Sequence, residues 1–163
     1  MMFQIYTLGC KVNQYDSARL EAFLLSRGFL LSEKNADLII INTCAVTASA
    51  IFKGDRLLKQ LKKIHPKAET VAIGCRLKAG QDGEMATDIN ISEKKEELIF
   101  SQIAKLFKLD FCSREKLSGI FPLGERNRYF LKIQDGCWQF CSYCLIPYVR
   151  VDLYSKPVED VVS

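Results

Sequence analysis

The sequence lacks any apolar stretch long enough to cross a membrane, and it lacks an N-terminal secretory signal. Its longest strongly apolar run, residues 38–41, falls far short of the roughly 18 residues that a membrane-spanning helix needs. The N-terminus has no basic segment followed by an apolar one, as a signal peptide would have. With 48% hydrophobic and 26% charged residues, the composition is typical of a globular protein. We therefore expect a cytoplasmic protein with no membrane partner.

Histidine is also scarce, which limits the kinds of metal site that the chain can form. Its one histidine, His65, is distant from a run of three cysteines near the C-terminus, Cys137, Cys141 and Cys144. Structural zinc normally takes four Cys or His ligands, so a zinc site would need Cys112 as well and fits poorly. The chain has seven cysteines, an odd number, which disfavours a disulfide framework. In a reducing cytosol, clustered cysteines more often bind metal or take part in catalysis.

The three cysteines near the C-terminus have the spacing C-x3-C-x2-C. Three thiolates can hold a four-iron cluster and leave one iron without a protein ligand. Such an iron can bind a small molecule and pass an electron to it. This spacing therefore favours an iron-sulfur site over zinc.

Short β-rich runs alternate with helical patterns through the first two thirds of the chain. The expected strands are residues 3–8, 37–42, 70–73 and 88–91, and the expected helices are 17–27, 45–64 and 93–107. Strand and helix in alternation imply right-handed crossovers and a parallel sheet. We predict an α/β fold with a parallel sheet of the Rossmann or flavodoxin-like kind.

Three further cysteines, Cys10, Cys44 and Cys75, each come just after one of the first three expected strands. The carboxyl ends of parallel strands meet at one edge of the sheet, where open α/β sheets bind ligands. A single cysteine at such a position is more often a small buried hydrophobe. Three at equivalent positions favour a second three-thiolate cluster site.

The motifs around these cysteines resemble those of the radical S-adenosylmethionine methylthiotransferases. The resemblance rests on residues 7–17, 42–47, 74–75 and 133–148, which hold both cysteine triads in the family's order. The segment Lys-Val-Asn-Gln after Cys10 is most similar to the branch that modifies threonylcarbamoyladenosine in tRNA. Two other branches act on isopentenyladenosine and on a ribosomal protein.

The resemblance implies two 4Fe-4S clusters and S-adenosyl-L-methionine as cofactors. Cys137, Cys141 and Cys144 would hold the cluster that binds S-adenosylmethionine, with Tyr143 against its adenine. An auxiliary cluster that carries the sulfur would be held by Cys10, Cys44 and Cys75. The implied reaction adds a methylthio group to C2 of N6-threonylcarbamoyladenosine at nucleotide 37 of tRNA, with an electron donor such as flavodoxin or ferredoxin. An unactivated C–H bond requires this radical chemistry, which the cofactors supply.

The same resemblance divides the chain into three parts. Residues 1–108 would form the methylthiotransferase N-terminal domain, 109–128 a linker that contains Cys112, and 129–163 the incomplete start of a radical SAM partial α/β barrel, beginning with a strand at 129–133. Members of the family continue beyond this point, so we expect the isolated chain not to turn over. Two alternatives are a non-catalytic iron-sulfur binding module and a ribosomal-protein methylthiotransferase.

Several residues near the cysteines have two interpretations each. Asn13 and Asp16 can orient the loop after Cys10 or cap the following helix, and we favour capping for Asp16. Gly9 and Gly136 can admit backbone amides to the cluster sulfides or serve only as turn glycines. A basic helix face can contact RNA phosphates, which the net charge of +4 permits, or can be merely a solvated side. That face consists of Lys53, Arg56, Lys59, Lys62 and Lys63.

Overall fold

A computed structural model of the chain describes residues 1–32, 34–78, 85–93, 95–110 and 130–162, and places a parallel sheet at its centre. The sheet has five strands in the order β2-β1-β3-β4-β5, and every neighbouring pair is parallel. The strands are β1 (Met2–Thr7), β2 (Leu30–Leu31), β3 (Leu38–Thr43), β4 (Glu69–Gly74) and β5 (Ile89–Asn90). This is the flavodoxin-like strand order. The chain adds β2 on one side of β1 and then returns to add β3, β4 and β5 on the other side, so the order of the strands reverses between β1 and β3. The predicted α/β fold class is confirmed for this part of the chain.

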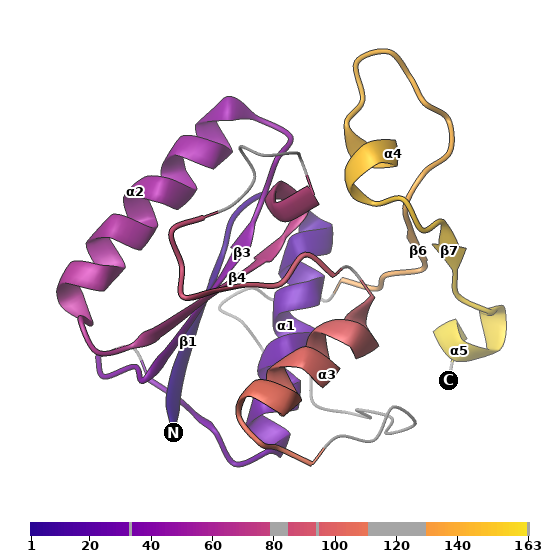
Figure 1. The fold of residues 1–163 in the computed structure, drawn as a ribbon. Helices are drawn as coiled ribbons and strands as arrows, with labels where there is room; N and C mark the ends of the chain where they lie inside the picture. The colour runs from indigo at the N-terminus through magenta and orange to yellow at the C-terminus, as the bar shows by residue number, and fades with distance from the viewer. Residues whose placement is uncertain (33, 79–84, 94, 111–129, 163) are drawn as a thin grey trace.

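Helices cover both faces of the sheet (Figure 1). On one face lies α2 (Ala48–Ile64), and on the other lie α1 (Lys11–Ser26) and α3 (Glu96–Leu106). Strand β3 is buried along its whole length because its side chains alternate between the two layers. Leu38 and Ile40 pack with α1 and α3, whereas Ile39 and Ile41 pack with α2.

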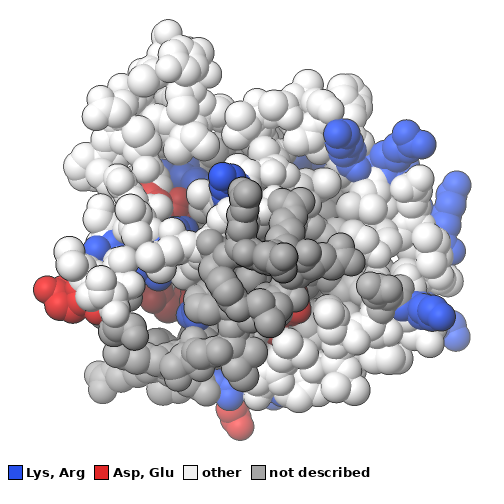
Figure 2. Space-filling view, turned by 180° about the vertical axis from the view of Figure 1, so that it is seen from behind, with Lys and Arg blue, Asp and Glu red and all other residues white. Residues whose placement is uncertain are grey.

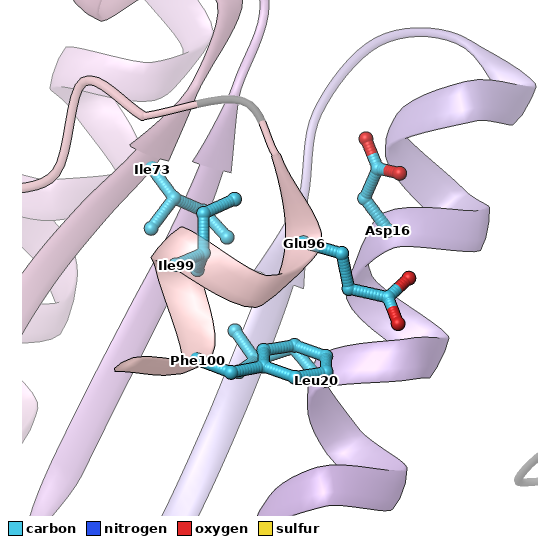
Figure 3. A pocket seen from close by; sticks show the side chains of 6 residues that line it. All are labelled: Asp16, Leu20, Ile73, Glu96, Ile99 and Phe100. Carbon is cyan, nitrogen blue, oxygen red and sulfur yellow. The ribbon is translucent and has the colours of Figure 1, made fainter. Parts of the chain in front are cut away.

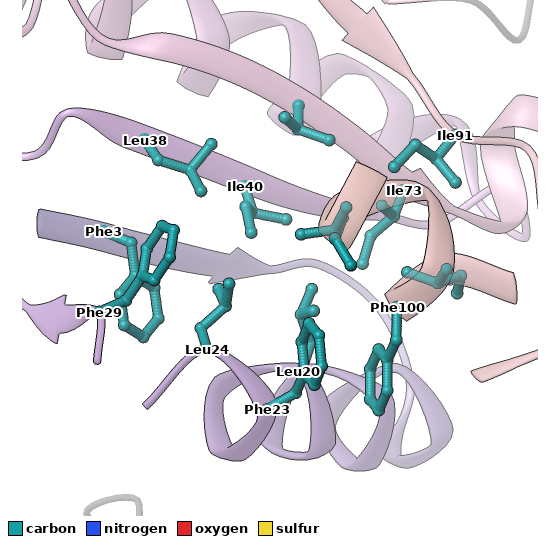
Figure 4. Packing of buried hydrophobic residues seen from close by; sticks show 14 residues of the cluster. Phe3, Leu20, Phe23, Leu24, Phe29, Leu38, Ile40, Ile73, Ile91 and Phe100 are labelled. Atoms are coloured by element: carbon teal, nitrogen blue, oxygen red, sulfur yellow. The ribbon is translucent and has the colours of Figure 1, made fainter. Parts of the chain in front are cut away.

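Aromatic side chains fill the layer between the sheet and helices α1 and α3 (Figure 4). Phe23 of α1 and Phe100 of α3 stack with ring centroids 4.6 Å apart and planes 6° apart. Phe3 of β1 meets Phe29 edge to face at 6.3 Å. The stacked pair fixes α3 against α1 and so completes this face of the core.

Helix α1 begins at Lys11, six residues before the predicted start. Residues 11–16 were expected to lie in the loop after Cys10, ahead of the helix at 17–27, and this expectation is wrong. Asn13 and Ser17 are polar yet buried, at 0% and 5% exposure, because they face the ends of the strands. Helix α2 begins after the N-cap Thr47, whose hydroxyl accepts a hydrogen bond from the Ala50 amide.

The C-terminal part folds back toward the sheet. It contains β6 (Gln134–Asp135), α4 (Ile146–Val149), β7 (Tyr154–Ser155) and α5 (Val158–Val162), and β6 pairs antiparallel with β7. The strand expected at 129–133 is wrong in its described portion, residues 130–133, because the strand starts at Gln134. Most of the predicted linker, and Cys112 with it, lies outside the described residues. Within the described ranges, no helix is both long and apolar enough to span a bilayer.

Candidate functional site

The three N-terminal cysteines lie at the carboxyl ends of three adjacent strands. Cys10 follows β1 and is the N-cap residue of α1, Cys44 follows β3, and Cys75 opens a short 3-10 turn, η1 (Cys75–Lys78), after β4. Strands β1, β3 and β4 are neighbours in the sheet. Cys44 and Cys75 are buried, while Cys10 is exposed to solvent. The structure therefore brings this triad to one edge of the sheet.

Asn13 occupies the space between these cysteines. Its Oδ1 lies 3.8 Å from the Sγ of Cys10 and 4.0 Å from the Sγ of Cys75, close enough for both thiols to donate to it. Its Nδ2 donates to the carbonyl of Leu8 at 2.8 Å and to that of Thr43 at 2.9 Å. One side chain thus holds the turns after β1 and β3 together and faces two of the sulfurs. Of the two roles open for Asn13, orientation of the cysteine loop agrees with these contacts.

Gly9 allows the Cys10 turn to approach Cys44. Its φ is +106°, in the region that favours glycine. A Cβ at this position would lie 2.7 Å from the Cβ of Cys44 and 2.8 Å from its Sγ. A side chain would therefore push the first two cysteine loops apart.

The second triad lies on the loop between β6 and α4. Cys137 and Cys144 are partly exposed and Cys141 is exposed. The Cys144 amide donates to the Cys141 carbonyl at 2.9 Å, which closes the loop into a turn. The loop starts at Gly136, whose φ is +79° and which packs closely on the backbone of residues 150–152. Tyr143, assigned by resemblance to S-adenosylmethionine, is 91% exposed.

Two large aromatic side chains of this loop project outward. Trp138 is 66% exposed and Phe140 is 56% exposed, and Phe140 packs edge-on against the ring of Tyr148 at 5.7 Å. Phe140 also has a positive φ of 45°.

A small apolar contact joins the second loop to the first triad. Val149, at the end of α4, is fully buried and packs with Ala45 and Cys75, and Leu145 lies at its margin. Helix α4 follows Cys144 almost directly. The segment that carries the second triad therefore rests on the sheet edge that carries the first.

Four charged side chains reinforce this contact, and we call them the ion cluster: Asp16, Lys132, Asp135 and Arg150. Arg150 Nη1 lies 2.7 Å from both carboxylate oxygens of Asp135, and its Nη2 lies 2.9 Å from Asp16 Oδ2. Lys132 Nζ lies 2.6 Å from Asp16 and 3.0 Å from Asp135. Because Asp16 lies within α1 and pairs with these cations, the prediction that it caps the helix is wrong.

Arg150 also reaches the first triad itself. Its Nε donates to the Sγ of Cys75 at 3.3 Å, and its Nη2 donates to Asn13 Oδ1 at 3.0 Å. Its side chain is 5% exposed. Sequence reasoning missed this residue, since nothing local to Arg150 shows that it faces a cysteine 75 positions earlier.

The protonation states of the ion cluster follow from its charges. Burial by itself lowers the pKa of Arg150, but its electrostatic interactions with Cys75, Asp16 and Asp135 outweigh burial and raise that pKa above its usual value. Burial by itself raises the pKa of Asp135, whereas the cations Arg150 and Lys132 lower it overall. Burial by itself likewise lowers the pKa of Lys132, but interactions with Asp16 and Asp135 outweigh it and raise that pKa, so Arg150, Lys132 and Asp135 are charged at neutral pH.

Cysteine thiolates are the protein ligands of iron-sulfur clusters, and hydrogen bonds to their sulfurs are a feature of such sites. Among the described residues, no group of three or more His, Cys, Asp or Glu side chains could hold a metal ion. Each triad also has a sulfur with an N–H donor at 3.5 Å, from Val46 to Cys44 and from Gln139 to Cys137. Such hydrogen bonds to sulfur tune iron-sulfur clusters, so the donor set fits that group.

Two other features of the surface lie outside the cysteine sites. A shallow pocket between α1, α3 and β4 is lined by Asp16, Leu20, Ile73, Glu96, Ile99 and Phe100 (Figure 3). Both of its carboxylates are already engaged, that of Asp16 in the ion cluster and that of Glu96 with Arg19 at 2.7 Å. The basic face of α2 is exposed, and Lys and Arg side chains line the right-hand edge of Figure 2, where α2 lies. Neither feature holds a cysteine.

The chain is similar in sequence to one protein family and to several known tRNA-modifying enzymes. A family model described as "Uncharacterized protein family UPF0004" matches residues 2–105. A threonylcarbamoyladenosine tRNA methylthiotransferase MtaB from Chlamydia pneumoniae is 38% identical, over 99% of this chain and 38% of the relative. A tRNA-2-methylthio-N(6)-dimethylallyladenosine synthase from Neorickettsia sennetsu is 33% identical, over 98% of this chain and 38% of the relative. The MtaB of Aquifex aeolicus is 33% identical, over 96% of this chain and 42% of the relative. The chain thus spans about two fifths of the length of these relatives.

Proposed function

This chain belongs to the UPF0004 family, the N-terminal domain of methylthiotransferases, and we propose on that premise that it is the N-terminal part of a tRNA methylthiotransferase. The proposed reaction adds a methylthio group to C2 of N6-threonylcarbamoyladenosine at nucleotide 37 of tRNA. Two of the relatives above carry the name of that activity, and one carries the name of the dimethylallyladenosine reaction. The Lys-Val-Asn-Gln segment after Cys10 favours the former.

We assign the two triads to two 4Fe-4S clusters. Cys10, Cys44 and Cys75 would hold the auxiliary cluster. Cys137, Cys141 and Cys144 would hold the cluster that binds S-adenosylmethionine, with Tyr143 near its adenine. When bound, these groups supply a 5'-deoxyadenosyl radical, which activates the C–H bond, and the sulfur that replaces the hydrogen. The electron donor would be a flavodoxin or ferredoxin. A tRNA substrate would place the protein in the cytoplasm.

The chain's own contribution is to position these groups. One observation carries the proposal: three cysteines follow three adjacent parallel strands, and the loop with the second triad is docked on the same edge. Asn13 holds the turns of the first triad together, and Arg150 binds that triad to the second loop. Both cofactor sites then belong to one face of the molecule. The barrel start proposed for residues 129–163 would complete the second site.

Anaerobic reconstitution with iron and sulfide tests the cluster assignment. The chain should take up two clusters, and replacing either triad by alanine, Cys10/Cys44/Cys75→Ala or Cys137/Cys141/Cys144→Ala, should remove about half of the iron. The matched control is Cys112→Ala, which alters a cysteine outside both triads and should leave the iron content unchanged. Equal iron in all of these proteins would contradict the assignment.

The nucleosides of tRNA test the substrate. Cells without the gene should lose the 2-methylthio derivative of N6-threonylcarbamoyladenosine, as measured by mass spectrometry of digested bulk tRNA. Loss of the 2-methylthio dimethylallyl derivative instead would assign the reaction of the second relative. An unchanged nucleoside profile would contradict a tRNA substrate and favour a ribosomal-protein substrate or a non-catalytic module.

A further inference from the structure

Arg150 stands out because it joins a cysteine of the first triad to the segment that carries the second. The five donors of its guanidinium are directed at one sulfur, two carboxylates and one amide oxygen. Ion pairing alone would not require Nε to face Cys75, since Nη1 and Nη2 already meet the carboxylates. The hydrogen bond from Arg150 Nε to the Cys75 sulfur is therefore distinct from the ion pairs that Arg150 makes with Asp16 and Asp135.

We propose that Arg150 is a positioning residue that sets the reduction potential of the cluster held by Cys10, Cys44 and Cys75, through its hydrogen bond to the Cys75 sulfur. This inference rests on the proposed function, because it requires a cluster at that triad. The inference concerns the reduction potential of the cluster, which the identity of its three cysteine ligands does not determine.

The charge and burial of this contact determine its direction. The Nε–Sγ distance is 3.3 Å, Cys75 is 3% exposed and the Arg150 side chain is 5% exposed. Water therefore screens the interaction only weakly, and a charge-assisted hydrogen bond is stronger there than in solvent. Reduction adds negative charge to a cluster, and a cation hydrogen-bonded to a ligand sulfur stabilises the reduced form. Arg150 should raise the potential.

The neighbours of Arg150 make its charge important. The ion cluster contains two cations and two carboxylates, so it is neutral as a whole. Removing Arg150 leaves Lys132 with two carboxylates and a net negative charge next to Cys75. The neutral variant Arg150→Gln therefore loses the hydrogen bond and also places negative charge near the cluster. Both changes disfavour reduction.

The test uses the 163-residue chain with Cys137/Cys141/Cys144→Ala, so that one cluster remains. Its midpoint potential is measured by redox titration followed by electron paramagnetic resonance. Arg150→Gln should shift the potential to a more negative value, and Arg150→Lys, which keeps the charge but not the planar donor fork, should shift it less. The matched control is Arg19→Gln, which removes the same charge from a partly buried pair with Glu96 and should leave the potential unchanged.

The outcomes separate this inference from the function on which it rests. If the starting protein takes up no cluster, the assignment of the first triad fails. If it takes up a cluster and Arg150→Gln has the potential of Arg19→Gln, the inference alone is wrong. An Arg150→Gln protein that keeps its native circular dichroism but binds less iron than Arg19→Gln supports the positioning role, because Cys75 is then held less well. Loss of native circular dichroism in both Arg150 variants would show a purely structural role and overturn the inference.

Discussion

Substitution of Asn13 by alanine should weaken the fold at the edge where the first cysteine triad lies. The Asn13 side chain is fully buried, and its Nδ2 donates to the carbonyls of Leu8 and Thr43. Alanine leaves both acceptors without this donor and allows no water to replace it at the buried Thr43 carbonyl. Arg150 loses one acceptor but keeps its two carboxylates.

The contacts of Asn13 set the expected magnitude. An unsatisfied buried acceptor costs about 1–3 kcal/mol, and the Leu8 carbonyl, being only partly buried, should cost the lower value. The sum is about 2–4 kcal/mol, and the higher helix propensity of alanine at this position in α1 offsets roughly 0.5 kcal/mol of it. We therefore expect Asn13→Ala to lower the free energy of unfolding by about 1.5–3.5 kcal/mol. Urea denaturation followed by circular dichroism measures this change.

Asn90 provides the matched control. Its side chain also bonds the backbone, with Nδ2 donating to the Met85 carbonyl at 3.0 Å, but the residue is exposed. Water can replace that bond, so Asn90→Ala should cost less than about 1 kcal/mol. If the two substitutions cost the same, Asn13 does not organise the cysteine turns, and the reasoning above is refuted.

Three further substitutions test the site and the core. Gly9→Ala should destabilise the chain and reduce its iron content more than Gly28→Ala does, because both glycines have positive φ but only at Gly9 would the Cβ meet Cys44. Leu58 lies on the buried face of α2 and is 3% exposed, so Leu58→Ala should lower the free energy of unfolding by about 2–4 kcal/mol, as measured by urea denaturation. The lowered pKa of Asp135 means that its carboxylate stabilises the fold above about pH 4 and that this contribution is lost as the pH falls through the lowered value. Asp135→Asn should therefore flatten the acid dependence of the urea midpoint, and an unchanged dependence would contradict the pairing.

The sheet and its main helices could be predicted because burial leaves a periodic signal. Residues 37–42, which include the apolar run at 38–41, were predicted to form a strand of a parallel sheet, and β3 lies there, buried along its whole length. Two errors have physical causes. Strand β2 has only two residues, Leu30 and Leu31, both more than half exposed, so it carries no burial pattern. The start of α1 was missed because Asn13 is a buried polar residue in its first turn, and polar residues in a sequence usually indicate solvent.

The position of Cys10, Cys44 and Cys75 after three neighbouring strands could also be predicted, since parallel topology alone brings the ends of β1, β3 and β4 to one edge. The ion cluster could not be predicted from the sequence. Asp16 and Arg150 are 134 positions apart, and the sequence does not show which of its many opposite charges will meet. The only available signal was the occurrence of an acidic residue after Cys10 and a basic one after Cys144, within six residues of each. The pairing became visible only when the two segments were placed together.

The balance of contacts between these segments explains why polar residues matter there. The apolar contact around Val149 is small, and a few apolar side chains can slide over one another with little loss of free energy. Arg150 instead meets both oxygens of Asp135 at 2.7 Å, a directional contact that fixes angle as well as distance. Replacing a buried ion pair by apolar residues often leaves stability unchanged. Removing only one partner, in contrast, leaves the other charge buried without its counter-ion and is destabilising. Single substitutions in the ion cluster should therefore change the geometry and potential of the cysteine site and also lower the free energy of unfolding.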